Sequence, residues 1–362
     1  MEMYIYGAGN AGAEVLENLK LYYPTQMESL CGFMDQNKKM PVNGIPIVPI
    51  ENVNIDARIV IAIRSRDIAI EVQSELRRKG FSDVWWYTNR WKKYGVDFWH
   101  EMCMSCKGWK APILPQVEMH IMDACNLNCR GCAHFSPIFH NGIPDFSSRI
   151  SDVKKFSQKF GHIIRFVILG GEPFLNKEIG RYAEKIRELL PNSLIEIVTN
   201  GILIPHVSEE ILEKIRENNI CISISEYEPT HRIIHDITRA LENMGILYEV
   251  RSYESKQKFN IPLSLIKDSK HEKLCISNGC ITIWNGKMAR CPTLMYIDRF
   301  NQQFGQQLPN DGVMSLDEGI AGEELICKFK ERVPLCDYCV RNEISWDVCS
   351  PPIRQEDFAV ED

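Results

Sequence analysis

The 362-residue sequence lacks the features of membrane, secreted and nucleic-acid-binding proteins. It contains no run of about 18 apolar residues, so we expect no membrane-spanning helix. Its first residues, MEMYIYGAGN, lack the basic segment and long apolar stretch of a signal peptide. The net charge is −6, and without a basic excess we do not expect nucleic acid as the main ligand. We therefore expect a cytoplasmic protein.

Cysteine, in contrast, is abundant, with 14 residues. Disulfides are not expected in the cytoplasm, and isolated cysteines such as Cys31 and Cys221 are typical of small buried apolar residues. Three cysteines in the stretch CNLNCRGC, namely Cys125, Cys129 and Cys132, are too close together for that role. Ligation of a metal or an iron–sulfur cluster explains them better.

The order of strands and helices predicts an α/β protein with several parts. Residues 1–88 alternate short apolar strands with helices, which is typical of a parallel, Rossmann-like sheet. Residues 89–115, rich in Trp, Lys and Pro, are predicted to be a connector. Residues 116–260 resume the alternation with nearly continuous apolar strands, which predicts a partial (β/α)6-type barrel. Residues 261–362 contain short strands and many of the remaining cysteines, and they predict a small cysteine-rich extension.

The three close cysteines, here called the triad, follow the first predicted barrel strand, at residues 117–123. Barrel enzymes carry their chemistry on loops at the carboxyl ends of the strands. Three thiolates hold three irons of a [4Fe–4S] cluster, so the fourth iron is left for another ligand. An open coordination position is typical of a catalytic metal site. A structural zinc site and a fortuitous group of thiols are the alternatives.

The CxxxCxxC spacing of the triad resembles that of the radical S-adenosylmethionine (SAM) superfamily. The resemblance implies that the open iron binds the amino and carboxylate groups of SAM. It further implies that SAM is cleaved reductively to a 5′-deoxyadenosyl radical, which abstracts hydrogen from a substrate. The cofactor supplies this chemistry while the protein orients it. An oxygen-sensitive enzyme with a reductant such as flavodoxin or ferredoxin follows from the resemblance, whereas no catalytic side chain is assigned.

A second motif, GGEP, follows the next predicted strand, at residues 163–169. Gly170 and Gly171 allow a ligand to approach the backbone closely. The carboxylate of Glu172 can accept a charge-assisted hydrogen bond from an ammonium group, and Pro173 restricts the turn. The motif resembles the GGEP motif of the same family, which implies that these residues bind the amino group of SAM.

Three polar residues end the next two predicted strands. They are Asn200, Ser223 and Ser225. The resemblance implies that they contact the carboxylate and ribose of SAM, although Ser and Asn are also common in caps and turns. Many family members have an aromatic residue before the third cysteine, where this chain has Gly131. His134 and Phe135 are the candidates to contact the adenine instead.

A second group of cysteines lies in the C-terminal region. Its predicted members are Cys275, Cys291, Cys336 and Cys339. Their order resembles the SPASM/twitch extension of the family, which implies one auxiliary [4Fe–4S] cluster. Four thiolates leave no open position, which suits electron transfer or a structural role. Cys280 is an alternative to Cys275 as the first ligand. A second auxiliary cluster would draw on Cys280, Cys349 and the CxxC pair Cys103 and Cys106.

The N-terminal stretch GAGNAG lies between a predicted strand and a predicted helix, as in the dinucleotide-binding fingerprint. Gly7, Gly9 and Gly12 would let a phosphate group rest on the helix N-terminus, and Asp35 at the end of the next strand would bind ribose hydroxyls. The region resembles the small Rossmann-like domain attached to bacterial surface-sugar enzymes. This predicts a nucleotide or sugar-nucleotide ligand, with a structural or docking role as the alternative.

Three functions remain open from the sequence. The first is a radical SAM enzyme that oxidises or epimerises a sugar, an aminocyclitol or a sugar nucleotide, with the auxiliary cluster accepting an electron. The second is a SPASM-type maturase that modifies a side chain of a peptide or protein, although no winged-helix leader-binding domain is recognisable. The third, from another class, is a non-catalytic nucleotide-binding protein.

Overall fold

The computed structural model describes residues 1–88, 98–139, 143–268, 275 and 279–361. The chain divides into two compact units, Met1–Lys110 and Ala111–Asp362. The prediction of a mixed α/β protein with parallel sheets is confirmed. Among the helices in these ranges, none is both long enough and apolar enough to cross a membrane.

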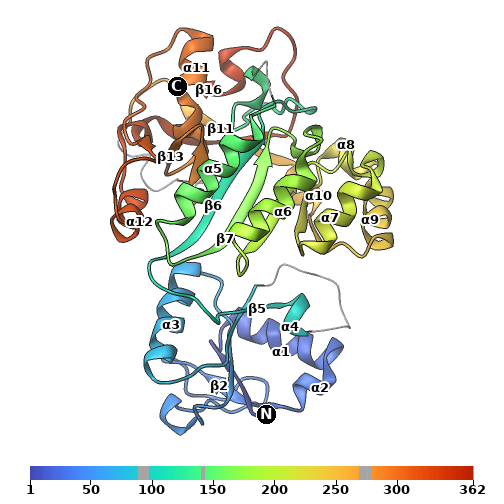
Figure 1. The fold of residues 1–362 in the computed structure, drawn as a ribbon, viewed down its shortest axis with the longest axis vertical. Coiled ribbons are helices and arrows are strands. Elements are labelled where there is room, and N and C mark those ends of the chain that lie inside the picture. The colour runs from blue at the N-terminus through green and yellow to red at the C-terminus, as the bar shows by residue number, and fades with distance from the viewer. Residues whose placement is uncertain (89–97, 140–142, 269–274, 276–278, 362) are drawn as a thin grey trace. The chain divides into compact units, whose positions relative to one another are not determined.

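The first unit contains a five-stranded sheet of order β2-β1-β3-β4-β5 (Figure 1). Its elements are β1 (Met3–Tyr6), α1 (Asn10–Tyr22), α2 (Pro24–Met27), β2 (Leu30–Met34), η1 (Ile50–Asn52), β3 (Arg58–Ile61), α3 (Arg66–Arg78), β4 (Val84–Tyr87), α4 (Phe98–Glu101) and β5 (Cys103–Ser105). β1 pairs in parallel with both β2 and β3. Strand β2 therefore lies on one side of β1, and β3 and β4 follow on the other side. Such a topological switch point leaves a crevice at the carboxyl ends of the strands.

Helix α1 belongs to the core of this unit because its apolar residues recur at helical spacing. Val15, Leu16 and Leu19 are fully buried and share one cluster with Ile5 of β1 and Val60 of β3. Residues three and four positions apart lie on the same face of a helix, so this spacing directs one side of α1 onto the sheet.

Part of the predicted connector, residues 89–115, is a strand of the first sheet. Residues 89–97 lie outside the described residues, but Cys103–Ser105 forms β5 and pairs antiparallel with β4. Without β5, β4 would be an edge strand with unpaired backbone groups. The local sequence of this segment has no clean period, so its pairing could not be predicted from that sequence alone.

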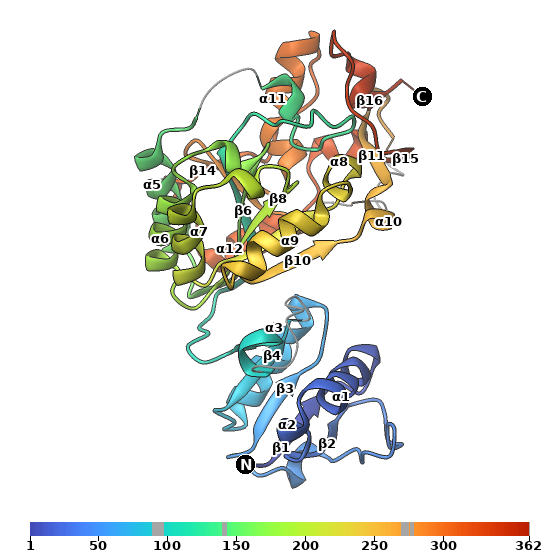
Figure 2. The same ribbon diagram turned by 90° about the vertical axis from the view of Figure 1, so that its right-hand side faces the viewer.

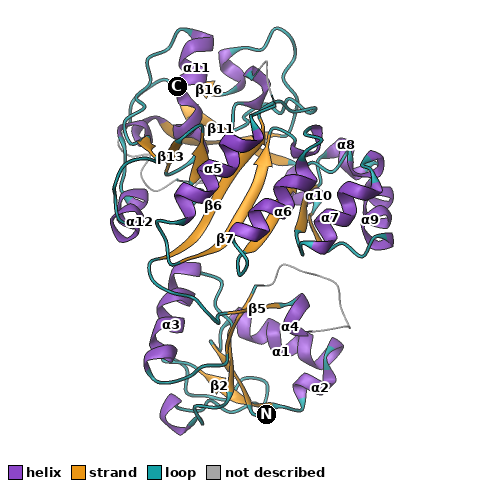
Figure 3. Cartoon of the chain, viewed as in Figure 1, coloured by secondary structure: helices purple, strands orange, loops and turns teal. Residues whose placement is uncertain are grey.

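The second unit is built on an eight-stranded sheet of order β10-β9-β8-β7-β6-β12-β13-β14. The strands are β6 (Ile113–Met122), β7 (His162–Gly170), β8 (Leu194–Thr199), β9 (Cys221–Ser225), β10 (Tyr248–Arg251), β12 (Thr282–Trp284), β13 (Lys287–Ala289) and β14 (Met314–Ser315). The helices of the repeating part are α5 (Phe146–Ser157), α6 (Ile179–Leu189), α7 (Glu209–Glu217), α8 (Glu228–His231) and α9 (Ile234–Asn243). Strands β6 to β10 are parallel and each pairs with the next, while helices cover the strands (Figure 3).

The five strands β6 to β10 correspond to the five predicted for the partial barrel, and in the described part of the chain no further strand joins beside β10. After β10 only Ser252 to Gln257, containing α10 (Tyr253–Lys256), precede β11 (Lys258–Ser264). A crossover between parallel strands needs about a dozen residues or more, so β11 cannot join beside β10. Instead β12 joins the opposite edge and pairs in parallel with β6.

Strand β11 belongs to a separate three-stranded sheet near the C-terminus. It pairs antiparallel with β15 (Cys339–Ser345) and in parallel with β16 (Ala359–Val360). Figure 2 shows β11, β15 and β16 grouped together, away from α6, α7 and α9. The remaining helices of the unit are η2 (Ser136–Ile138), η3 (Pro173–Leu175), η4 (Ile204–His206), α11 (Pro292–Phe304), α12 (Gly322–Lys330), η6 (Pro334–Tyr338) and η7 (Gln355–Asp357).

Candidate active site

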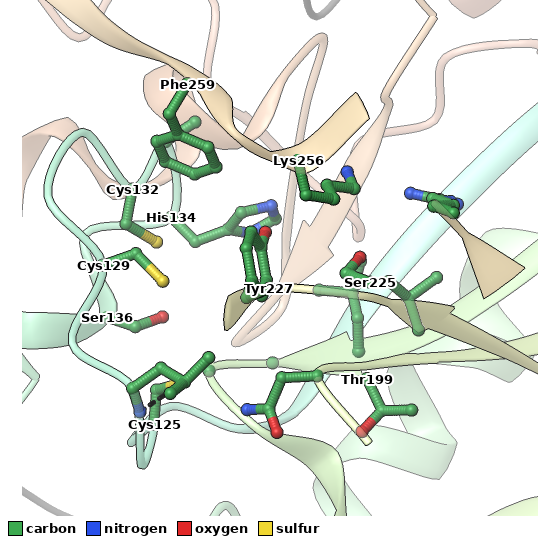
Figure 4. Close-up of a pocket in the computed structure, with 18 of the residues that line it drawn as sticks. Cys125, Cys129, Cys132, His134, Ser136, Thr199, Ser225, Tyr227, Lys256 and Phe259 are labelled. Carbon is green, nitrogen blue, oxygen red and sulfur yellow. Dashed lines mark hydrogen bonds between the residues drawn. The ribbon is translucent and has the colours of Figure 1, made fainter. Parts of the chain in front are cut away.

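A cavity of about 460 Å³ lies at the carboxyl ends of β7 to β10. Its lining includes Cys125, Cys129, Cys132, Gly170, Gly171, Thr199, Asn200 and Ser225. In Figure 4 the triad lies along one side of the cavity, and Ser225 and Lys256 lie on the other side of Tyr227. The structure therefore brings residues of the CxxxCxxC loop, the GGEP turn and two later strand ends to one cavity.

The three thiols of the triad occupy similar environments. Cys129 is buried, while Cys125 and Cys132 are half-buried. Burial raises the pKa of the Cys125 thiol to about 11, and burial together with the neighbouring Cys132 raises the pKa of Cys129. Because metals bind the thiolate form, a metal centre would have to offset this shift.

The C-terminal segment packs against the triad loop, which the sequence analysis did not anticipate. The indole N–H of Trp346 donates a hydrogen bond to Cys129 Sγ at 3.2 Å. The ring of Trp346 stacks on Tyr227, with a centroid separation of 5.2 Å. Cys349 N–H donates to the carbonyl oxygen of Asn128 at 2.9 Å. The partners lie some 200 residues apart in the sequence, so no local pattern reveals the contact.

Gly131 is explained by the backbone rather than by a ligand. Its φ is +75°, and a Cβ at this position would overlap the carbonyl oxygen of Asn260 on β11. An aromatic residue before the third cysteine is therefore excluded here. Of the two predicted substitutes, His134 lines the cavity, whereas Phe135 is fully buried in the apolar core beside Phe300 and cannot contact a ligand there.

Gly170 and Gly171 are required by close backbone contacts. A Cβ on Gly170 would overlap the carbonyl oxygen of Met122, and a Cβ on Gly171 would overlap that of Ala124. The N–H groups of Gly171 and Glu172 donate to these same carbonyl oxygens, at 2.8 Å and 2.9 Å. The GGEP turn is thus bonded to the segment that leads into the triad.

Glu172, predicted to bind the amino group of SAM, is engaged by groups of the protein. Its carboxylate is fully buried, does not line the cavity, and accepts hydrogen bonds from Thr199 Oγ1 at 2.7 Å, Asn200 N–H at 2.9 Å and Phe174 N–H at 3.1 Å. Burial raises its pKa to about 7. These bonds make Glu172 a positioning residue that holds the end of β8, while Pro173 begins the short helix η3.

Two of the three predicted polar strand-end residues line the cavity. Asn200 donates from Nδ2 to Asn126 Oδ1 at 2.7 Å, and its own Oδ1 accepts from Ile202 N–H at 3.1 Å. Ser225 lines the cavity from the end of β9. Ser223 does not line it, because its hydroxyl donates to Glu249 on the neighbouring strand at 2.6 Å.

Charged side chains that the sequence analysis did not single out also line the cavity. They are Glu118, Arg165, Arg251, Lys256 and Lys258. Glu118 accepts a hydrogen bond from Thr282 Oγ1 at 2.9 Å, and burial raises its pKa to about 7. Glu118 interrupts the apolar strand β6 and Arg165 interrupts β7, while Arg251 is the last residue of β10. An inward-facing charge in a buried strand is the signal that could have identified them.

Two histidines in contact, the buried His120 and the half-buried His134, lie at the cavity, and His134 lines it. His120 Nδ1 lies 3.2 Å from Asp123 Oδ1, and His120 Nε2 lies 2.7 Å from His134 Nδ1. Burial lowers the pKa of both histidines. The His120 ring also stacks on Tyr296 with a centroid separation of 4.5 Å, so the pair is held between the barrel and α11.

The four cysteines predicted to hold an auxiliary cluster lie near one another; we call them the quartet. They are Cys275, Cys291, Cys336 and Cys339, and none of them lines the cavity. Burial raises the pKa of Cys291 to about 12, with Cys275 and Cys336 close enough to contribute. Cys280, the alternative first ligand, lines the cavity, where Gln116 Nε2 lies 3.9 Å from its sulfur.

The other cysteines are distributed differently. Cys103 and Cys106 are buried in the first unit. Cys349 is buried beside the triad, where Asp357 and Cys132 add to the effect of burial and raise its pKa to about 12. Nowhere in the described ranges do three His, Cys, Asp or Glu side chains converge on a point that could hold one metal ion. In a [4Fe–4S] cluster each thiolate binds a separate iron, so its ligands do not need to converge.

A second cavity, of about 440 Å³, lies at the switch point of the first sheet. Gly7 and Gly9 line it, but Gly12 does not. A Cβ on Gly12 would overlap the carbonyl oxygen of Gly7, and Gly7 has a φ of +107°, so both are needed by the fold. A Cβ on Gly9 would have no heavy atom within 4 Å. Of these three glycines, Gly9 is therefore the one where an added side chain would project into the cavity.

Asp35 lines this cavity but is already engaged by the backbone. Its Oδ2 accepts from Ala8 N–H at 2.8 Å, and its Oδ1 accepts from Asn37 and Lys38 N–H at 2.9 Å each. Burial raises its pKa, but these bonds and the Lys38 charge outweigh burial and lower it. Asp35 thus joins two loops, and only Oδ2 retains capacity for the predicted ribose hydroxyls.

Several solved structures resemble parts of this chain. One, native anSMEcpe with bound AdoMet and Cp18Cys peptide, is 23% identical over 38% of this chain and 42% of that chain, with a TM-score of 0.30. SuiB of Streptococcus suis bound to S-adenosylmethionine is 19% identical over 39% and 34%, with a TM-score of 0.29. BtrN in complex with AdoMet and 2-DOIA is 15% identical over 68% and 98%, with a TM-score of 0.38. This chain covers less than half the length of the first two.

Comparison with curated proteins found no match. Comparison with protein-family models matched residues 119–262 to the radical SAM superfamily. The matched residues run from β6 to β11 and contain both the triad and the GGEP turn. The chain therefore contains a radical SAM domain.

Proposed function

We propose that this chain is a cytoplasmic radical SAM enzyme whose triad holds the SAM-binding [4Fe–4S] cluster. The observation that carries the proposal is the shared cavity: the three triad thiols, Gly170 and Gly171 of the GGEP turn, and three polar residues from two strand ends line the same space. A flavodoxin or ferredoxin would supply the electron.

The donor set fits the cofactor. Three half-buried or buried thiols on one loop provide soft ligands for iron and leave one position open. When bound, the cluster and SAM together supply a 5′-deoxyadenosyl radical that takes a hydrogen atom from the substrate. The cavity lining provides polar groups for SAM at Thr199, Asn200 and Ser225.

The chain's own side chains would orient the cofactor and restrict water. Glu172 holds Thr199 and Asn200, so these groups enter the cavity from a rigid strand end. Tyr227 and Trp346 stack beside the triad and limit access of solvent to Cys129. Preorganised groups of this kind lower the cost of aligning the reacting atoms.

The quartet is proposed to hold one auxiliary [4Fe–4S] cluster of the twitch type. The mutual proximity of Cys275, Cys291, Cys336 and Cys339 supports this proposal and favours Cys275 as first ligand. A cluster ligated by four thiolates suits electron transfer. An oxidation of a small molecule, which releases an electron after hydrogen abstraction, would use such a site.

We assign a sugar, an aminocyclitol or a sugar nucleotide as the substrate. The polar and charged lining of the cavity supports a small hydrophilic molecule. The first unit would then bind a nucleotide or sugar nucleotide at its switch-point cavity, which the open space at Gly9 supports. A peptide substrate is the outcome that would favour a SPASM-type maturase.

Anaerobic reconstitution with iron and sulfide, followed by a SAM-cleavage assay with dithionite, tests the proposal. The wild-type protein should bind about eight irons and release 5′-deoxyadenosine, because one three-thiolate and one four-thiolate cluster carry four irons each. A variant with all three triad cysteines changed to Ala should release none. Release of 5′-deoxyadenosine by that variant would refute the assignment of the triad.

A further inference from the structure

Basic side chains in the SAM cavity are unequally paired. The four are Arg165, Arg251, Lys256 and Lys258. Arg165 forms an ion pair with Glu196, and Lys258 Nζ lies 2.7 Å from Glu343 Oε1. These two cations are neutralised within the protein, so they do not require a ligand.

Lys256 is the basic residue that lacks such a partner. It is half-buried at the end of α10, and no hydrogen bond or ion pair joins its ammonium to any residue that the structure describes. Its Nζ lies 5.8 Å from the ring centroid of Tyr227, which gives only a weak cation–π attraction. Burial and the neighbouring Arg251 lower the pKa of Lys256 to about 8.

Arg251 makes one long ion pair, and its charge also acts on the buried Glu118 in the same cavity. Its Nε lies 3.8 Å from Glu249 Oε1, and that carboxylate also accepts the short hydrogen bond from Ser223. Arg251 lies close enough to Lys256 to lower the pKa of that ammonium. Two cations that repel each other in a half-buried cavity are unfavourable unless an anion binds between them.

The charge of SAM cannot balance both cations. SAM carries one carboxylate, together with an ammonium and a sulfonium group, so its carboxylate can pair with one of the two. A guanidinium beside an ammonium suits the several oxygen atoms of a phosphate group. We infer that Lys256, together with Arg251, binds a phosphate or diphosphate group of a second ligand beside SAM. The inference rests on the proposed function and makes the substrate a phosphorylated small molecule.

Titration calorimetry with inorganic pyrophosphate as probe tests this inference. The full-length, anaerobically reconstituted protein is titrated in the presence of saturating SAM. We compare the wild type with Lys256→Gln, Lys256→Arg and the control Lys258→Gln, whose lysine lines the same cavity but is paired. Lys256→Gln should weaken pyrophosphate binding about tenfold or more, as expected for loss of a charged hydrogen bond. Lys256→Arg should retain binding, and Lys258→Gln should change it less than about fivefold.

Three results would overturn the inference. Wild-type protein that binds no pyrophosphate, or that loses it equally in both glutamine variants, has no phosphate site at Lys256. Displacement of pyrophosphate by SAM, or an equal loss of SAM affinity in Lys256→Gln, would assign the cation to the carboxylate of SAM. Tighter binding of succinate than of pyrophosphate would indicate a carboxylate ligand instead.

The same preparations separate this inference from the proposed function. Protein that binds pyrophosphate through Lys256 but releases no 5′-deoxyadenosine would support the anion site and refute radical SAM activity. Protein that cleaves SAM but does not bind pyrophosphate would refute the anion site alone.

Discussion

The triad and the quartet are both groups of close cysteines, yet they differ in what surrounds them. The triad lines a cavity of about 460 Å³ together with glycines and polar strand ends. The quartet comes from the segment before β12, the start of α11, η6 and the start of β15, and none of its thiols lines that cavity.

The difference indicates that cysteine side chains serve two different purposes in the triad and in the quartet. A ligand can approach a three-thiolate centre only where the fold leaves space beside it, and the triad has that space. Four thiolates complete a cluster without an added ligand, and none of the quartet's thiols lines the cavity beside the triad. The spacing of cysteines alone cannot supply this distinction, because it depends on what packs around them.

The largest expected effect comes from removing half of the quartet. The double substitution Cys336→Ser with Cys339→Ser should remove about four irons of about eight, because one four-thiolate cluster is lost. Cleavage of SAM to 5′-deoxyadenosine should persist, since neither residue lines the cavity. Iron and 5′-deoxyadenosine are measured on the same sample. Loss of all iron in folded protein would contradict two independent clusters.

The second-largest expected effect is steric and concerns the loop that carries the triad, not the quartet. Gly171→Ala should reduce SAM cleavage roughly 100-fold, because its Cβ would overlap the carbonyl oxygen of Ala124 and displace the loop before Cys125. The control is Gly319→Ala, where a Cβ has no heavy atom within 4 Å. Equal SAM-cleavage rates in both variants would show that the close contact at Gly171 does not matter.

A third substitution tests whether the open space at Gly9, in the first unit, is needed for ligand binding. Gly9→Val should abolish binding of nucleotides or sugar nucleotides to the full-length protein, because the side chain would project into the switch-point cavity. The thermal unfolding midpoint should not change, since no atom lies near the added Cβ. Calorimetry of wild type against a nucleotide panel, with a Kd at or below roughly 1 mM, provides the reference. Undiminished nucleotide binding in the variant would exclude the switch-point cavity as the nucleotide site.

The smallest effect concerns the hydrogen bond from Trp346 to Cys129. Hydrogen bonds to cluster sulfurs raise the reduction potential, so Trp346→Phe should lower that of the triad cluster. A net contribution of about 0.5 to 1.5 kcal/mol corresponds to roughly 20 to 60 mV for one electron. Potentiometric titration followed by electron paramagnetic resonance measures the shift. Trp85→Phe, in the first unit, is the control and should leave the potential unchanged.

The sequence predicted what depends on neighbouring residues. The order of strands and helices, the position of the triad after β6 and the position of GGEP after β7 follow from local periodicity and spacing. Gly170 and Gly171 were predicted to let a ligand approach the backbone, whereas the contacts that exclude a Cβ there are with the carbonyl oxygens of Met122 and Ala124.

What the sequence could not predict depends on contacts between distant segments. Glu172 was expected to face a ligand, but its partners Thr199 and Asn200 lie on another strand and direct it into the core. The pairing of β11 with β15 joins two segments that are far apart in the sequence. Among the described residues Lys256 has no hydrogen-bond or ion-pair partner, and because this depends on every segment around the cavity, no local pattern could indicate it.

The most direct test of the difference between the triad and the quartet is the response of each cluster to SAM. Electron paramagnetic resonance of dithionite-reduced protein is recorded with and without SAM, for the triad Cys→Ala variant and for the Cys336→Ser, Cys339→Ser variant. We predict that SAM changes the spectrum of the second variant, which retains the triad, and leaves that of the first unchanged. A SAM-dependent change in the triad variant would contradict the assignment of SAM binding to Cys125, Cys129 and Cys132.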